Sequence, residues 1–307
     1  MKNLFCFVLL ILSFKISFPQ QSDTTIIVDQ HYVTLSNVVV DNRLNVKSFI
    51  NRIKSDSSFY KAFKNLRILG YTAINDIRML DADGKYKATL HSKTHQIRTA
   101  NCRKMTTLEE ESSGDIYKAN HSFNYYTAQM YASLFFTKDS VCSENNIVGN
   151  ESFNTQNKSG LEKHKEQLKM LFFNPGKKID GLPFMSGKTA IYDENMCDYY
   201  NMQIGFDFHN TTNCYVLKQT VKPGMEDNVV VDEMTTWFND STFEIVGRTY
   251  TLSYDAGFYD FKVNMEVQMT KYKNLIVPCL IKYNGNWKAI FKKRERGVFT
   301  ATLFDFE

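Results

Sequence analysis

The sequence predicts an α+β fold: a large, curved antiparallel β-sheet, an unclosed half-barrel, whose apolar concave face is covered by helices. The first reason is the stretch 258–270, where apolar and polar side chains alternate as they do on the two faces of a strand. Such a strand is about twice as long as the five or six residues of an ordinary one, which favours a large sheet. The second reason is that turn-rich connectors separate the strand-like runs after residue 179, which indicates an antiparallel meander.

The N-terminal third is predicted to contain two short strands, a helical region and a long hairpin. The strand-like runs are rich in β-branched residues. Asn45 fits an N-cap, because apolar residues recur after it at helical spacing. Asp83-Gly84 is a strong turn signal between two alternating runs. These elements are expected at 24–28, 32–40, 45–66, 71–80 and 85–97.

The middle of the chain is predicted to be a loop and helix insertion at about 100–160. The strand pattern fades there, and Glu109–Gly114 is typical of a solvated loop. Residues 123–136 form an aromatic, amphipathic helical pattern, and 161–173 form another that ends before Asn174-Pro175-Gly176. Together with 45–66, these helices are expected to cover the apolar face of the sheet.

The C-terminal part is predicted to contain strands alone. Asn239-Asp240-Ser241, Asp255-Ala256-Gly257 and Asn284-Gly285-Asn286 are the expected turns. The strands are expected at 189–192, 198–208, 214–221, 229–238, 243–254, 258–269, 275–283, 287–293 and 298–306.

The first residues are typical of a secretory signal. Lys2 precedes the apolar run 4–14, and a polar stretch begins at Gln20, so we expect residues 1–20 to be removed on export. Residues 21–307 are enough for a single large domain. The chain has 37 Lys and Arg against 33 Asp and Glu, a balance that argues against a nucleic-acid partner. We expect a periplasmic or extracellular protein, with the outer membrane among its locations.

Five cysteines follow the predicted signal, and an odd number leaves at least one unpaired in an oxidising compartment. Cys102 with Cys142 is one candidate pair. No two cysteines have the C-x-x-C spacing of zinc ribbons or thioredoxin-like sites. The sequence leaves the pairing open among Cys102, Cys142, Cys197, Cys214 and Cys279.

The motifs that carry catalysis or cofactor binding find no match in this sequence. Gly181–Thr189 superficially resembles a phosphate-binding loop, but its glycines have the wrong spacing and a strand is expected to follow. His91 and His95 on one straight strand would be about 13 Å apart, too far for one metal ion. Neither a hydrolytic triad nor a carboxylate pair stands out. We therefore expect no enzyme, no cofactor, no metal and no nucleotide.

The apolar face of the long strand at 258–270 is the candidate ligand-binding surface. Aromatic and aliphatic side chains on a covered concave face could contact the apolar part of a ligand. The other interpretation is ordinary core, since any large sheet must bury one face. The candidate residues are Tyr259, Phe261, Val263, Met265, Val267 and Met269.

The order of these elements resembles the outer-membrane lipoprotein-sorting (lipoprotein-carrier) superfamily. An N-terminal helix precedes the long hairpin, and the segments 168–184, 236–250 and 275–287 then introduce the meander strands. The resemblance covers about two thirds of the mature chain and excludes roughly 100–160. It implies an unclosed β-barrel whose helices cover an apolar cavity for acyl chains, and it assigns no individual residue a role.

The leading hypothesis is non-covalent binding of a lipid or of a lipoprotein acyl chain. A structural or interaction module with a filled core, which meets an exported protein partner, is the alternative. An outer-membrane β-barrel also has alternating strands, but the predicted helices and the charged run 292–296 argue against it.

Overall fold

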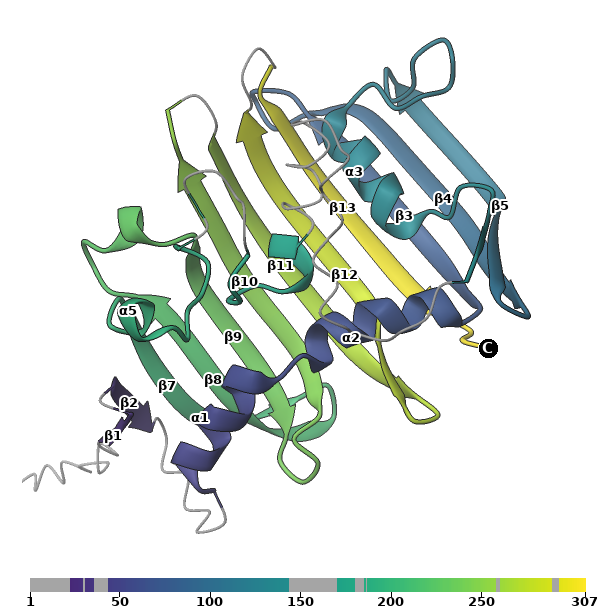
Figure 1. Ribbon diagram of the computed structural model, residues 1–307. Coiled ribbons are helices and arrows are strands. Elements are labelled where there is room, and N and C mark those ends of the chain that lie inside the picture. Colours follow the sequence, from purple (N-terminus) through teal and green to yellow (C-terminus); the bar gives the residue numbers. More distant parts are fainter. Residues whose placement is uncertain are drawn as a thin grey trace, which may run out of the picture.

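The computed structural model forms one 13-stranded sheet with helices on one face (Figure 1). It describes residues 23–29, 31–35, 44–143, 170–179, 185, 187–257, 260–288 and 293–307. The strands are β1 (Thr24–Val28), β2 (His31–Leu35), β3 (Tyr71–Leu80), β4 (Tyr86–Thr99), β5 (Cys102–Gly114), β6 (Ser140–Cys142), β7 (Tyr200–His209), β8 (Thr212–Val221), β9 (Val231–Asn239), β10 (Ile245–Asp255), β11 (Asp260–Tyr272), β12 (Leu275–Lys288) and β13 (Glu295–Phe304). The helices are α1 (Val46–Ser55), α2 (Ser58–Asn65), α3 (Tyr126–Phe135) and α5 (Glu194–Cys197), with 3₁₀ turns η1 (Leu66–Ile68) and η2 (Glu226–Asn228).

The sheet is open and almost entirely antiparallel. Its strand order is β1-β2-β7-β8-β9-β10-β11-β12-β13-β3-β4-β5-β6, so in the described part of the chain the end strands β1 and β6 do not pair with each other. The hairpin β3–β4 adds to the last strand of the meander, because β3 pairs with β13. The pair β2–β7 is parallel. The predicted α+β class, with an unclosed curved sheet, is confirmed.

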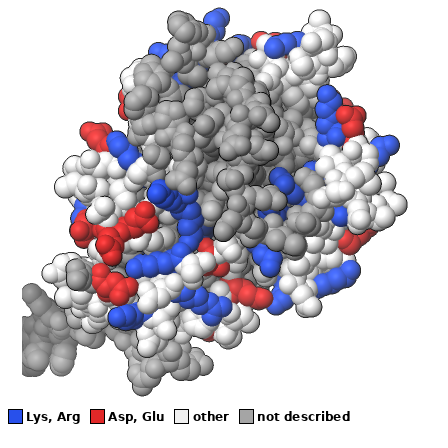
Figure 2. All heavy atoms as spheres, in the orientation of Figure 1, with Lys and Arg blue, Asp and Glu red and all other residues white. Residues whose placement is uncertain are grey.

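The covering helices form where the sequence predicts helical spacing. Asn45 is the N-cap of α1, and its Oδ1 accepts a hydrogen bond from the Ser48 backbone N–H at 2.9 Å. The apolar residues of α1 and α2 face the sheet, with Phe49 and Phe59 buried. Figure 1 shows α1, α2 and α3 on the same face of the sheet. Over the described surface of this face, acidic and basic side chains are interspersed (Figure 2).

The turn expected at Asn284-Gly285-Asn286 is wrong, because β12 continues through these residues to Lys288. Gly285 pairs with Val263 on one side and Gly297 on the other. A side chain at Gly285 would overlap the Tyr283 phenol, so the tyrosine ring occupies the space over the glycine. An aromatic ring over a strand glycine restores the contact that the missing side chain would make.

The loop expected at Glu109–Gly114 is also wrong, since these residues form the second half of β5 and pair with β4. Their side chains are exposed, which removes the apolar alternation that identifies a strand. The strand expected at 189–192 is a buried turn instead, with Ile191 fully buried and its N–H bonded to the Gly176 carbonyl at 3.1 Å.

Some predictions fall outside the described residues. These are the signal at 1–20, Tyr259 and most of the helix expected at 161–173. The end of that predicted helix is described, and residues 170–173 are helical.

Candidate functional site

The predicted ligand-binding residues of β11 lie on the buried face of the sheet. Phe261, Val263, Met265, Val267 and Met269 are between 0% and 7% exposed. Tyr259 lies outside the described residues. The strand therefore places these five side chains under the helices, in the position that either a ligand site or an ordinary core requires.

Helix α3 is fastened to the sheet by a carboxylate from β13. Its own N-cap residue makes no side-chain cap. Instead, the Glu295 carboxylate accepts hydrogen bonds from the backbone N–H groups of Tyr126 at 2.9 Å and Thr127 at 2.8 Å, and from the Thr127 hydroxyl at 2.8 Å. The Trp287 indole donates to the same hydroxyl at 2.6 Å. A negative charge at a helix N-terminus satisfies free N–H groups and the helix dipole together.

Aromatic rings fill most of the space between the sheet and the helices. Tyr283 and Phe299 stack with centroids 4.4 Å apart, and Tyr131 of α3 meets Phe299 at 4.5 Å. Phe63 of α2 meets Phe173 of the 170–173 segment at 4.5 Å. The interior is therefore well packed, and the free volume is confined to small cavities.

An open depression of about 560 Å³ lies on the face of β3 and β13 away from the helices, where Ile74, Arg78 and Thr300 line it. Three smaller cavities lie along the boundary between the helices and the sheet. One of about 110 Å³ lies at the α1–α2 junction, between Ile53 and Phe238. A second, of about 100 Å³, lies between α2 and α3. A third, of about 20 Å³, lies above β11 and β12, where Phe261, Val263 and Trp287 face Leu171 and Phe172. The volumes of these three cavities are below the roughly 300 Å³ at which small-molecule sites begin.

The cavity between α2 and α3, here called the α2–α3 pocket, has an aromatic wall and a basic rim. Its wall includes Phe63, Phe135 and Phe173. Its cationic residues come from three elements: Lys64 from α2, Arg67 from η1 and Arg103 from β5. The described lining residues are Tyr60, Phe63, Lys64, Leu66, Arg67, Tyr71, Gln96, Arg103, Ser133, Leu134, Phe135, Phe136 and Phe173.

A hydrogen-bond network holds the rim in place. The Gln96 amide donates to the carbonyls of Leu66 and Leu69, both at 2.8 Å, and so satisfies the end of the helical region. The Gln96 Oε1 accepts from Arg103 at 3.3 Å and from the Thr137 hydroxyl at 2.9 Å. Arg103 also donates to Thr137. Each rim element is thus fixed to its neighbour.

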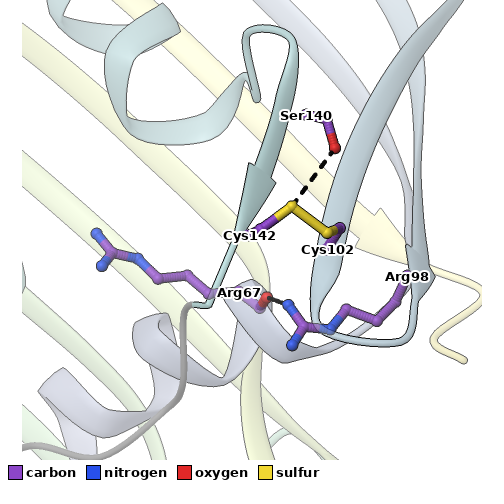
Figure 3. Close-up of a disulfide and its surroundings, with 5 residues drawn as sticks. All are labelled: Arg67, Arg98, Cys102, Ser140 and Cys142. Carbon is purple, nitrogen blue, oxygen red and sulfur yellow. Dashed lines mark hydrogen bonds between the residues drawn. A yellow bond between two sulfur atoms is a disulfide. The ribbon is translucent and has the colours of Figure 1, made fainter.

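A disulfide links β6, which follows α3 in the chain, to β5 at the end of the sheet. Cys102 of β5 and Cys142 of β6 are bonded, so this candidate pair is confirmed (Figure 3). Beside it, the Arg98 guanidinium donates to the Arg67 carbonyl at 2.9 Å, and the Arg67 side chain extends away from Arg98 (Figure 3). Cys197, Cys214 and Cys279 are free. Burial raises the pKa of the Cys197 thiol, which lowers its reactivity.

A second group of polar side chains is buried over β8–β10. Arg248 is 7% exposed, its Nε donates to the Thr236 hydroxyl at 2.9 Å, and its guanidinium lies 4.3 Å above the Phe59 ring. Burial lowers the pKa of Arg248 and that of Lys177. The amide of the fully buried Gln219 meets no hydrogen-bond partner among the described residues. These groups show that the cover is not uniformly apolar.

The described residues offer no cluster of three His, Cys, Asp or Glu side chains suited to a metal ion. Nor does any helix in this part of the chain have the length and apolar character needed to cross a membrane.

The sequence reasoning missed the rim of the α2–α3 pocket. Lys64, Arg67 and Arg103 belong to a helix, a 3₁₀ turn and a strand, and nothing in their local sequence indicates that they meet. In the helical region, the sequence gives one indication of the rim: basic residues recur at every third position in 61–67.

Known proteins give little further guidance on this chain. No protein family matches its sequence, and no curated protein matches it. Among solved structures it is similar to an outer membrane lipoprotein-sorting protein domain from Vibrio parahaemolyticus, with 10% identity and a TM-score of 0.27 over 81% of this chain and 91% of that one. It is also similar to a DUF1329 family protein from Desulfovibrio piger, with 12% identity and a TM-score of 0.25 over the same shares.

Proposed function

We propose that this is an exported protein that binds the acyl chain of a lipid or lipoprotein between its helices and the concave face of its sheet. The observation that carries the proposal is the position of the 170–173 segment. Phe173 lines the α2–α3 pocket, whereas Leu171 and Phe172 line the cavity above β11 and β12. One short segment therefore contributes to the lining of both cavities, and we expect its displacement to enlarge the space between the helices and the sheet.

Among the described residues, one hydrogen bond joins residues 170–173 to the sheet: the Tyr250 hydroxyl donates to the Phe172 carbonyl. The bond from the Asn174 N–H to the Met170 carbonyl, at 2.8 Å, lies within the helical turn itself. The apolar side chains of this segment supply the rest of the binding to the sheet, at about 2 kcal/mol for each one fully buried. The 170–173 segment is thus held against the sheet mainly by apolar contacts.

The energies of exchanging these side chains for an acyl chain are similar in size. Exposing the buried Leu171 and Phe172 and the half-buried Phe173 would cost about 5 kcal/mol. Burial of about twelve methylenes would contribute about 10 kcal/mol, at roughly 0.8 kcal/mol each. Association itself costs about 4 kcal/mol or more, so the two sides nearly balance and the affinity depends on how many displaced side chains find other apolar contacts.

Extraction and binding measurements test this proposal. The full chain, exported and purified without detergent, is extracted with organic solvent, and the extract is analysed by mass spectrometry. A fluorescent fatty acid is then titrated into the delipidated protein. We expect a stoichiometric lipid in the extract and saturable binding. Repeated absence of both would refute the proposal.

A variant that obstructs the α2–α3 pocket tests whether the fatty acid binds there. Ser133 is exposed and lines the α2–α3 pocket, so Ser133→Trp should obstruct its mouth and weaken fatty-acid binding about tenfold or more. Lys61 is exposed on α2 but does not line the pocket, so Lys61→Trp is the matched control and should bind as the natural chain does. Equal binding by the two variants would place the ligand elsewhere.

The dense packing supports a second candidate, an interaction module with a filled core. Tyr131, Phe299 and Tyr283 pack ring against ring beneath α3, as in an ordinary interior. This candidate predicts clean extracts and no saturable lipid binding, together with stable capture of an exported protein partner.

A further inference from the structure

A buried guanidinium lies on the helix-facing side of β10. Arg248 is 7% exposed and forms no ion pair with an Asp or Glu side chain in the part of the chain that the structure describes. Its contacts are the Thr236 hydroxyl, which accepts from Nε at 2.9 Å, and the Phe59 ring, 4.3 Å from the guanidinium. Asp56 is the acid whose charge acts on Arg248, but its carboxylate accepts hydrogen bonds from Ser58 instead. Because a buried cation without an ionic partner is costly, this guanidinium calls for an anion.

An amide that lacks hydrogen bonds lies on the same face of the sheet. Gln219 of β8 is fully buried, and neither its Nε2 nor its Oε1 has a hydrogen-bond partner among the described residues. Burial raises the pKa of Tyr192 to about 12, and Arg248 and Gln219 both act on this pKa in the opposite direction. The guanidinium and the amide therefore lie near one phenol and belong to one polar cluster. Since buried amides normally have partners, the missing partner points to a ligand.

A second cation adjoins this cluster. Lys177 is half-buried, its Nζ lies 5.6 Å from the centroid of the Tyr192 ring, and it donates to the carbonyls of residues 53 and 54 at the end of α1. The charges of Lys177 and Arg248 act on each other, and Asp56 is the carboxylate that acts on both. Two cations thus share one region with one carboxylate. An excess of positive charge favours an anionic ligand.

The polar cluster borders the apolar face of β11. Arg248 pairs with Val267, and Tyr250 pairs with Met265, so two of the candidate ligand-binding residues are its cross-strand neighbours. Side chains at such positions lie about 5 Å apart. The Tyr250 hydroxyl also donates to the Phe172 carbonyl, which places the 170–173 segment beside the cluster. A ligand with its anionic end at Arg248 would continue directly onto the apolar face of β11.

We propose that Arg248 and Gln219 bind the anionic group of an amphiphile, a carboxylate or a phosphate, while its acyl chain lies along the apolar face of β11. The guanidinium supplies two parallel N–H donors to the anion, and the amide supplies a third. The inference rests on the proposed function and narrows its ligand class to anionic lipids. The carboxylate of a fatty acid and the phosphate of a lysophosphatidic acid share this chemistry.

Three ligands with the same acyl chain test it: a fatty acid, a lysophosphatidic acid and an uncharged monoacylglycerol. We expect the delipidated full chain to bind at least one anionic ligand about tenfold more tightly than the monoacylglycerol. The preference should persist as salt is raised, because salt screens a buried ion pair much less than an exposed one. The anionic ligand that binds more tightly identifies the head group.

An arginine variant and its control test the role of the guanidinium. Arg248→Met keeps the volume of the side chain and should bind the three ligands about equally, which is a loss of about tenfold for the anionic ones. The matched control is Arg296→Met. Arg296 follows Glu295 in β13, and because Glu295 contacts α3, Arg296 faces away from the helices. The control should keep the natural preference.

An amide variant separates binding from folding. Gln219→Leu should weaken anionic binding about threefold and leave the monoacylglycerol unchanged. Its midpoint of urea unfolding should stay the same or rise, because the variant removes a buried amide that lacks partners. A merely structural amide would instead lower the stability and all three affinities together.

The outcomes distinguish this inference from the proposed function. If all three ligands bind equally, or the uncharged one binds best, anion recognition is refuted while acyl-chain binding stands. The same holds if Arg248→Met keeps the natural preference, or if raised salt abolishes that preference. If Arg248→Met does not fold, Gln219→Leu decides, and an unchanged anionic preference in it refutes the inference. If none of the three ligands binds, the proposed function itself fails.

Discussion

Removal of the Glu295 carboxylate should release helix α3 from the sheet. This carboxylate accepts three hydrogen bonds, from two backbone N–H groups and one hydroxyl of residues 126 and 127, at 2.8–2.9 Å. Each bond to a charged group contributes about 1.5 kcal/mol or more, but bonds to one group are not additive. The charge at the helix N-terminus contributes roughly 0.5 kcal/mol. We therefore expect Glu295→Ala to cost about 3 kcal/mol.

Hydrogen exchange and urea unfolding measure this loss. If α3 opens locally, its amides should exchange about 100-fold faster, since 1.4 kcal/mol corresponds to a factor of ten. The matched control is Glu233→Ala, because Glu233 forms a surface ion pair with Lys218 at 3.0 Å and should contribute less than 1 kcal/mol. If Glu295→Ala changes α3 exchange and unfolding no more than Glu233→Ala does, the capping argument is refuted.

Three further predictions concern the pH dependence, the buried cation and the disulfide. The folded pKa of Tyr71, about 12, lies above the unfolded value near 10, so its contribution to stability is complete below pH 10 and is lost as pH rises to 12. Buried tyrosines such as Tyr250 and Tyr283, whose pKa values burial also raises, lose their contribution to stability over the same range, and Tyr71→Phe should reduce the total loss by up to about 3 kcal/mol; a Tyr71→Phe pH profile equal to that of the natural chain would contradict this. Arg248→Met should keep the free energy of unfolding within about 1 kcal/mol, because it removes a buried charge and keeps the volume, whereas Arg248→Ala should lower it by about 3 kcal/mol; equal losses would refute the reasoning. Reduction of Cys102–Cys142, separated by 40 residues, should lower stability by about 4 kcal/mol, and reductant should not affect the Cys102→Ser/Cys142→Ser variant.

The local patterns of the sequence were enough to predict much of the sheet and its cover. The alternation in β11 and the Asp-Gly turn before β4 depend on neighbouring residues, as does the Asn45 cap of α1. In each case the same few residues determine both the pattern and the structure, so no tertiary information was needed.

Other features depend on contacts between distant residues. Gly285 looks like a turn residue until Tyr283 is seen to cover it between two paired strands. The second half of β5 lacks apolar alternation because its side chains are exposed, and only pairing with β4 makes it a strand. The basic rim likewise joins Lys64 and Arg103, which no local pattern connects.

The two tryptophans allow the most direct test of acyl-chain binding beneath the helices. Trp287 lines the cavity above β11 and β12. Trp237 lies on the other face of the sheet, between the buried Thr236 and Phe238, and its indole donates to Asp207 at 3.1 Å. A fatty acid brominated near the end of its chain quenches a tryptophan only at short range. We predict saturable quenching of Trp287 in Trp237→Phe and little quenching of Trp237 in Trp287→Phe. Quenching of neither tryptophan, or of Trp237 alone, would contradict an acyl chain bound between the helices and the sheet.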